Sequence, residues 1–443
     1  MKNFTKNYAA LMVMTLWVNL MIAQMSLTGE IRPRTEYRFG YQTPMDSVSK
    51  SSIFTSQRTR LNFGYSGENF KVGVSLQDVS VWGSQSQLTS SSTTSLLHEG
   101  WGQYWFCPKF SAKVGRQELN YDDERLFGAT SWQQQGRHHD LFLGIFEDTA
   151  SKFTFHFGAA YNRDAITNTG ANYTIASSYR TMEYLWLNKK FGSFGASLLF
   201  VNVGWQSPIG KNASRCFQTA GTHLEYKKDA LFASGKFYYQ MSGDSGSYTG
   251  TTTYKTAAAW MAGVDVQYTI AKKFTVGAGL EMMTGQSQTD TTKAYTEVNH
   301  TFNTLFGTGH KFNGYMDYYF AGSGHMNAGL QDIYVKLKYK EEKYWAGLDV
   351  HLFSTTADVF DIKKSAQMGM IMAMNKSLGT EIDFTLAYNL NKMVTLQCGY
   401  SQYLLTETTA AVKGLYRNNG DPDTRQTANW AYLMLTFKPN FLK

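Results

Sequence analysis

Cysteine, proline and long apolar runs are all scarce in this chain. Its 443 residues include only 6 prolines and 3 cysteines. The cysteines, Cys107, Cys216 and Cys398, are odd in number and lack CxxC spacing, which excludes a small domain held together by disulfides. After residue 23, no segment approaches the roughly 20 apolar residues of a membrane-spanning helix, and mean hydropathy is −0.35. A bundle of transmembrane helices is therefore excluded as well.

Glycine and aromatic residues are abundant instead. The chain has 39 Gly, 28 Tyr, 29 Phe and 10 Trp. Aromatic residues favour strands, and glycine is common where strands bend or pack closely. This composition predicts an all-β protein.

The first residues resemble an export signal. Lys2 and Lys6 precede an apolar stretch from Tyr8 to Ala23, and Ala23-Gln24 is a plausible cleavage point. The alternative is a single membrane-anchoring helix. We predict a cleaved signal peptide at residues 1–23 and one domain at 24–443. Loss of both lysines would lower the formal charge from +8 to about +6.

Most of the mature chain alternates apolar and polar residues with a period of two, as half-buried strands do. One such segment lies near residue 70 and another near residue 333. In the first, the apolar face is Phe70, Val72, Val74 and Leu76, against Lys71, Gly73, Ser75 and Gln77. In the second, it is Ile333, Val335, Leu337 and Tyr339, against Asp332, Tyr334, Lys336 and Lys338.

Short and long connections between these segments alternate strictly. Tight turns are predicted at Gly67-Glu68, Pro108, Thr149-Ala150, Gly192, Lys228, Ala271-Lys272, Glu341-Glu342 and Leu390-Asn391. Longer loops are predicted near 42–52, 84–94, 120–135, 164–179, 206–213, 243–256, 286–328, 356–375 and 406–426. These connections imply about 18 strands with both termini on one side. Short periplasmic turns and long external loops are typical of outer-membrane barrels.

Aromatic residues flank most of the tight turns, where a membrane interface would place them. The pairs are Tyr65 and Phe70, Phe106 and Phe110, Phe191 and Phe194, Tyr226 and Phe232, Tyr268 and Phe274, and Tyr339 and Tyr344. The alternative, packing inside a large soluble sandwich, gives no reason for aromatics at one end of nearly every hairpin. We therefore predict a transmembrane antiparallel β-barrel of about 18 strands.

The first strand fixes which face points inward. One face carries the charged residues Glu30, Arg32, Arg34, Glu36 and Arg38. A lipid-facing Arg near the midplane costs about 2–4 kcal/mol, so this face must point into the barrel. Arg58, Arg60 and Lys71 extend the charged wall. These charges either line a path for solutes or form a structural ladder that fills the barrel. Pro33 cannot donate to the sheet, so we expect a bulge or register break there.

Four segments carry a resemblance to a known family. The central one runs Gly115-Arg116-Gln117-Glu118-Leu119, then Tyr121 to Gly128, then Trp132-Gln133-Gln134. It resembles the alginate export family of outer-membrane proteins. The opening Leu27 to Arg38 and the run Ser56 to Leu61 look like the version found in Bacteroidetes, and Leu330 to Tyr334 is a further likeness.

The resemblance implies a monomeric 18-stranded barrel with an electropositive lumen that passes an acidic polysaccharide such as alginate. The planar guanidinium of Arg suits this role, because it can bind a carboxylate through two parallel hydrogen bonds. The expected pore-lining and anion-binding residues are Arg32, Arg34, Arg38, Arg58, Arg60, Lys71, Arg116 and Arg125, with Glu30 and Glu36 as pore-lining acids.

Two other clusters are weaker candidates for metal sites. Asp122-Asp123-Glu124 could bind calcium, but the full spacing of a calcium loop is missing; a solvated loop or a partner for lumen arginines is favoured. His138-His139-Asp140 could hold a metal, but neighbouring residues on a strand point to opposite faces. We expect neither a metal nor a cofactor.

The sequence therefore predicts an outer-membrane channel in a Gram-negative cell that passes anionic or polar solutes, such as acidic oligosaccharides or small anions. We predict no enzyme activity and no nucleic-acid partner; its partners are outer-membrane lipid and solute. The alternatives are a closed barrel acting as a surface adhesin through its 286–328 loop, and an outer-membrane hydrolase. The direction of transport and the position of the 286–328 loop, outside the bore or within it, stay open.

Overall fold

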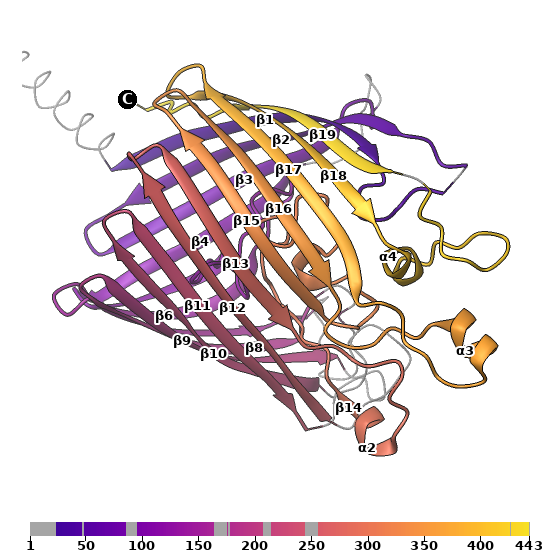
Figure 1. The fold of residues 1–443 in the computed structure, drawn as a ribbon. Coiled ribbons are helices and arrows are strands. Elements are labelled where there is room, and N and C mark those ends of the chain that lie inside the picture. Colours follow the sequence, from indigo (N-terminus) through magenta and orange to yellow (C-terminus); the bar gives the residue numbers. More distant parts are fainter. Residues whose placement is uncertain are drawn as a thin grey trace, which may run out of the picture.

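The computed structural model describes residues 24–46, 48–85, 95–163, 175, 178–206, 214–243, 256–425 and 427–442. Over these residues the chain forms a closed antiparallel barrel of 18 strands (Figure 1). Neighbouring strands pair in sequence order, and the last strand pairs back onto the first. The predicted fold class and strand number are confirmed. The predicted signal peptide, residues 1–23, lies outside the described residues.

The barrel strands cover nearly the whole described chain. They are β1 (Met25–Phe39), β2 (Ser52–Ser66), β3 (Phe70–Val81), β4 (Ser95–Cys107), β5 (Phe110–Gln117), β6 (His139–Asp148), β7 (Phe153–Tyr161), β8 (Thr181–Phe191), β9 (Phe194–Gln206), β10 (Ser214–Lys228), β11 (Leu231–Ser242), β12 (Thr256–Ile270), β13 (Phe274–Met283), β15 (Leu330–Lys340), β16 (Tyr344–Ser354), β17 (Ser377–Asn389), β18 (Val394–Leu405) and β19 (Ala428–Phe437).

The remaining elements are short and lie in the long connections. They are the two-residue strand β14 (Val298–Asn299), which pairs with the start of β12, the helices α2 (Lys293–Thr296), α3 (Ile362–Met368) and α4 (Glu407–Val412), and the 3-10 turn η1 (Phe320–Gly322). In Figure 1, α2, α3 and α4 lie at the end of the barrel opposite the start of β1 and the C-terminus. Among the described residues, no helix combines the length and apolarity needed to cross a bilayer.

The connections fall where the sequence predicts them. Eight are turns of two to four residues, and the nine that alternate with them are longer. Two of these longer connections are the segments 118–138, between β5 and β6, and 284–329, between β13 and β15, which is the longest. We call these loop A and loop B.

The two faces of the wall differ as the alternation predicts. Apolar side chains that point outward, such as Val114, Val264 and Leu433, are more than half exposed in the isolated chain, as expected for a surface that lipid covers. Aromatic rings meet beside the short turns: the centroids of Phe106 and Phe110 lie 5.5 Å apart. Phe232 is an exception among the predicted interface aromatics, because it lines an interior cavity.

Pro33 does not cause the predicted bulge or register break. The pairs between β1 and β19 pass from Ile31–Phe437 to Arg34–Met434 in unchanged register, and only Arg32 and Pro33 lack partners there. On its other side, Pro33 pairs with Gln57 within an unbroken ladder. The missing N–H of Pro33 therefore interrupts the pairing of β1 with β19 over two residues, and the strand otherwise stays regular.

Candidate functional site: the barrel interior

Loop A crosses the interior of the barrel. At one end, the Tyr121 hydroxyl lies 2.9 Å from the Tyr184 hydroxyl of β8 and 2.9 Å from His156 Nδ1 of β7. Near its other end, Gln134 Nε2 donates to Ser56 Oγ of β2 at 3.1 Å. Strands β2 and β8 are well separated around the wall, so the loop spans the bore between them.

Loop B also folds inward, on the side of the later strands. The Tyr315 backbone N–H donates to Asp383 Oδ2 of β17 at 3.3 Å. The Tyr319 hydroxyl lies 3.0 Å from the Tyr403 hydroxyl of β18. Residues Met316, Tyr318 and Tyr319 are fully buried. The sequence leaves open whether the 286–328 loop lies outside the bore or within it. In the structure, much of this loop lies within the bore.

The two loops pack against each other at the centre. The Phe306 N–H donates to the Leu126 carbonyl and the Gly128 N–H to the Phe306 carbonyl, both at 3.0 Å. Gly307 permits this approach, since a Cβ there would lie 2.2 Å from the Arg125 carbonyl oxygen. Together the loops narrow the passage.

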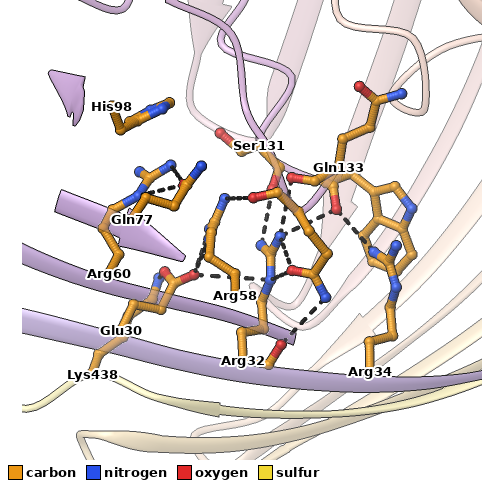
Figure 2. Close-up of polar contacts among 12 residues, drawn as sticks. Glu30, Arg32, Arg34, Arg58, Arg60, Gln77, His98, Ser131, Gln133 and Lys438 are labelled. Carbon is orange, nitrogen blue, oxygen red and sulfur yellow. Dashed lines mark hydrogen bonds and ion pairs between the residues drawn. The ribbon is translucent and has the colours of Figure 1, made fainter. Parts of the chain in front are cut away.

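Five arginines form a ladder on the inner face of β1 and β2, and Figure 2 shows four of them, Arg32, Arg34, Arg58 and Arg60. Neighbouring residues of β1, such as Ile31 and Thr35, are exposed on the outer face instead. The members of this arginine ladder are Arg32, Arg34, Arg38, Arg58 and Arg60.

Carboxylates neutralise part of the ladder. Glu36 accepts hydrogen bonds from Arg34 Nε at 2.9 Å and Arg38 Nη2 at 2.8 Å. Glu30 accepts from Arg58. Glu30 and Glu36 therefore act as partners of the arginines, as the structural-ladder alternative requires.

Loop A covers much of the ladder. The exposed fractions of Arg32, Arg34 and Arg58 are 7%, 5% and 3%, because carbonyl oxygens of loop A lie against their guanidinium groups. Arg38 and Arg60 keep partial exposure. In this conformation, only these two of the five offer their charge to open solvent.

The other three predicted cations are not brought into the ladder. Lys71 is exposed inside the barrel near a short turn, with its Nζ 5.3 Å from the Trp105 ring centroid. Arg125 is fully buried and binds Glu281 of β13.

The prediction that Arg116 lines the pore is wrong. Its side chain shares the outward face of β5 with Val114 and binds Asp140 through Nε and Nη2 at 2.8 and 2.9 Å. The motif that contains Arg116 spans the end of a strand, where a one-residue shift reverses the face.

An open cavity of about 530 Å³ lies along the inner faces of β10 to β17. Its lining includes aromatic rings, lysines and carboxylates. Among them are Lys236, Lys311, Lys336, Lys338, Asp265, Asp349, Tyr334 and Trp345. None of these residues is among the predicted pore-lining set, although Tyr334, Lys336 and Lys338 share the polar face of the strand near 333.

The acidic run of loop A binds protein groups. Asp123 Oδ2 accepts from Lys236 Nζ at 2.8 Å, and Asp122 accepts from the Trp186 indole. Burial alone would raise the pKa of Asp123, but the adjacent Lys236 ammonium lowers it to about 2. Glu124 lies close to Lys311 and Thr308. Asp123 and Glu124 thus pair with lysines, whereas the sequence favours a solvated loop or a partner for lumen arginines.

Successive residues of the run His138 to Asp140 point to opposite faces of the barrel wall, as the sequence predicts. His139 is buried inside, next to the Tyr179 hydroxyl, while Asp140 points outward to Arg116. Within the described ranges, no group of three or more His, Cys, Asp or Glu side chains is arranged to hold a metal ion.

Comparison with solved structures identifies barrels of the same fold. OccAB4 of Acinetobacter baumannii superposes with a TM-score of 0.61 at 12% identity, over 94% of this chain and 98% of that one. OccK9 (OpdG) of Pseudomonas aeruginosa gives 0.58 at 10% identity, over 95% and 100%. The outer membrane protein opdK of the same organism gives 0.54 at 10%, over 94% and 99%.

Likeness at this identity shows the fold, an outer-membrane type of β-barrel. No protein-family model matches the chain, and no curated protein matches it.

Proposed function

We propose that the protein is an outer-membrane channel for polar and anionic solutes, with acidic oligosaccharides as its candidate cargo. The observation that carries the channel is the inner face of a closed barrel: charged side chains and an open cavity lie inside an outer face of apolar residues. Barrels of 16 to 18 strands are wide enough for an aqueous passage. The cargo class rests on the resemblance to the alginate export family, and the same resemblance suggests a monomer.

Anion preference is the finer part of the proposal. The arginine ladder, with Lys438 beside it, presents six cations to three carboxylates, Glu30, Glu36 and Glu118. The excess positive charge would attract an anion wherever the passage narrows to about the screening length of 8 Å. Arg38 and Arg60 are the ladder members best placed to act, because they are partly exposed.

Two observations weaken the alternative functions. An adhesin that used the 286–328 loop would need that loop outside, whereas its residues from Phe302 to Tyr319 are largely buried in the bore. A hydrolase would need a nucleophile beside a base. His310 and His351 each pair with an aspartate, at 3.1 and 2.9 Å, but in the described part of the chain no Ser, Thr or Cys is bonded to either ring.

A planar-bilayer recording tests the proposal. Purified full-length protein should conduct, and its reversal potential in a KCl gradient should indicate a preference for chloride. Arg38→Gln with Arg60→Gln should lower that preference, while Arg425→Gln, in an external loop where Arg425 pairs with Asp423, should leave it unchanged. Absence of any conductance would refute the channel. Conductance with equal reversal potentials in all three proteins would refute the role of the ladder in selectivity.

A further inference from the structure

The guanidinium group of Arg32 is bound almost entirely by neutral oxygens of loop A. It donates to the carbonyl oxygens of Ser131, Trp132 and Gln133 at 2.9, 3.2 and 3.2 Å. It also donates to Gln134 Oε1 from both Nε and Nη2, at 3.1 and 3.0 Å. The carboxylate of Glu30 stands farther away, at 3.8 Å. Figure 2 shows Arg32 surrounded by these acceptors.

The same short segment occupies a second arginine. Arg34 Nη1 donates to the Trp132 carbonyl at 2.8 Å, and its guanidinium carbon lies 4.3 Å from the centroid of the Trp132 ring. Segment 131–134 thus presents a row of oxygens to two adjacent guanidinium groups. A carboxylate is a stronger acceptor for such donors than a carbonyl oxygen, because the hydrogen bond is then charge-assisted on both sides.

The charge around the segment also favours an anion. The ladder has more cations than carboxylates, and the acceptors in segment 131–134 bear no formal charge. Buried positive charge without a full counter-charge is costly, and a bound anion would relieve it.

We propose that segment 131–134 is an autoinhibitory stand-in for an anionic ligand, and that a carboxylate-bearing oligosaccharide displaces it from Arg32 and Arg34 to widen the passage. The inference rests on the proposed channel function and adds regulation by the cargo. It assigns loop A a second conformation, in which its carbonyl oxygens leave the ladder and the solute takes their place.

Loop A is built so that this segment can move as a unit. The Arg137 N–H donates to the Ala129 carbonyl at 2.7 Å and closes the base of a compact loop. Gly136, at the end of that loop, has φ +68°, a conformation that glycine adopts without strain. Segment 131–134 can therefore leave the ladder while β5 and β6 keep their pairing.

Displacement would also reach loop B. The Trp132 ring lies between Arg34 and the His310 ring, with its centroid 4.2 Å from that of His310 and the planes 7° apart. His310 in turn is bonded to Asp317, which accepts from Tyr41. Withdrawal of Trp132 removes one side of the His310 packing, so both loops that narrow the bore respond to one event.

Hydrogen–deuterium exchange on the full-length protein in detergent tests the displacement. The probe is tetragalacturonate, with maltotetraose as the neutral oligosaccharide of equal length. Tetragalacturonate should speed exchange in peptides that cover 129–137 by about tenfold, which corresponds to about 1.4 kcal/mol of lost protection. Maltotetraose should not change it. Equal or slower exchange with tetragalacturonate, at concentrations where the reversal potential or current shows that it enters the channel, would overturn the proposal.

The substitution Arg32→Lys distinguishes the effect of the planar guanidinium group and its hydrogen bonds from the effect of the positive charge. Lysine keeps the positive charge but cannot hold several carbonyl oxygens in a fixed plane. The variant should show faster exchange in 129–137 and higher conductance without ligand, with anion preference retained. Arg425→Gln serves as the matched control and should behave as the wild type. If a folded Arg32→Lys protein, verified by its heat-modifiable electrophoretic mobility, exchanges like the wild type, the fork does not hold the segment.

The two proposals fail separately. If no protein in the series conducts, the channel function fails. If all conduct and the loop exchange never responds to tetragalacturonate, only the displacement fails.

Discussion

At the scale of single residues, most interior charges hold the two loops in place. Arg125 of loop A is fully buried and donates to Glu281 of β13. Lys236 of β11 bridges Glu281 and Asp123, both at 2.8 Å. Arg125 Nε and Nη1 are buried without a hydrogen-bond partner in the described part of the chain, so the cluster fixes the position of loop A at little net gain in stability. Arg125 therefore anchors a loop and is unable to meet solute in this conformation.

His325 also holds loop B in place, through hydrogen bonds to the backbone that depend on the protonation state of its ring. Its Nε2 donates to the Gly322 carbonyl at 2.6 Å, and its Nδ1 accepts from the Gly329 N–H at 3.1 Å. The bond from Gly329 requires the neutral ring, since a protonated Nδ1 would face the Gly329 donor. Burial, helped by the nearby Lys413 ammonium, lowers the pKa of His325 to about 4.

This predicts that loop B loosens in acid. Because the folded pKa lies below the usual value of about 6.5, the opened loop takes up the proton more readily. Protection is then complete above about pH 6.5 and falls by roughly 3 kcal/mol as the pH drops to about 4. Hydrogen exchange of residues 320–329, corrected for intrinsic rates, should accelerate between pH 7 and pH 4.5. In His325→Asn the corrected exchange should lose this pH dependence; an equal pH response in both proteins would contradict the assignment.

At the scale of elements, the strands were largely predictable and the inner loops were not. Side chains along a strand alternate between the two faces with a period of two, so the sequence alone places Val335 and Lys336 on opposite faces. Loops A and B have no such period, and their positions depend on distant partners such as Glu281 and Asp383. Arg116 shows where the alternation of faces fails as a guide. It lies next to the end of β5 and was predicted to face the pore, whereas its side chain points outward. Pro33 shows another, since the neighbouring strands tolerate one missing donor without a bulge.

The assignment of faces yields a test on β12. Val264 is 57% exposed on the outer face near the middle of that strand, and Gln267 shares the inner face with Asp265. Val264→Arg should lower the free energy of unfolding in lipid bilayers by about 2–4 kcal/mol, whereas Gln267→Arg should cost far less. The check is urea unfolding in vesicles followed by tryptophan fluorescence. Equal stability of the two variants would show that Val264 does not face the hydrocarbon.

At the scale of the whole molecule, charge is divided between two parts of the wall. Arginines dominate β1 and β2, while carboxylates recur on the inner faces of β12 to β17. These carboxylates are Asp265, Glu281, Asp332, Asp349, Glu381 and Asp383. Loop B covers several of them: Glu381 accepts from the Met316 N–H at 2.6 Å, and Asp332 accepts from Asn313 at 3.2 Å. The loop thus screens an acidic wall from the bore.

Removal of loop B from the bore should therefore change both the single-channel conductance and the ion selectivity. Replacement of residues 305–326 by a short Gly-Ser linker opens the cross-section of an 18-stranded barrel, so single-channel conductance should rise severalfold. It also exposes Glu381, Asp332 and Asp383 to water, so the reversal potential in a KCl gradient should shift towards cations. A matched deletion of 362–371, which removes α3 at the external tip of another loop, should alter neither quantity. If instead the loop B deletion leaves conductance unchanged, loop B does not narrow the path, and the ladder side of the bore carries the current alone.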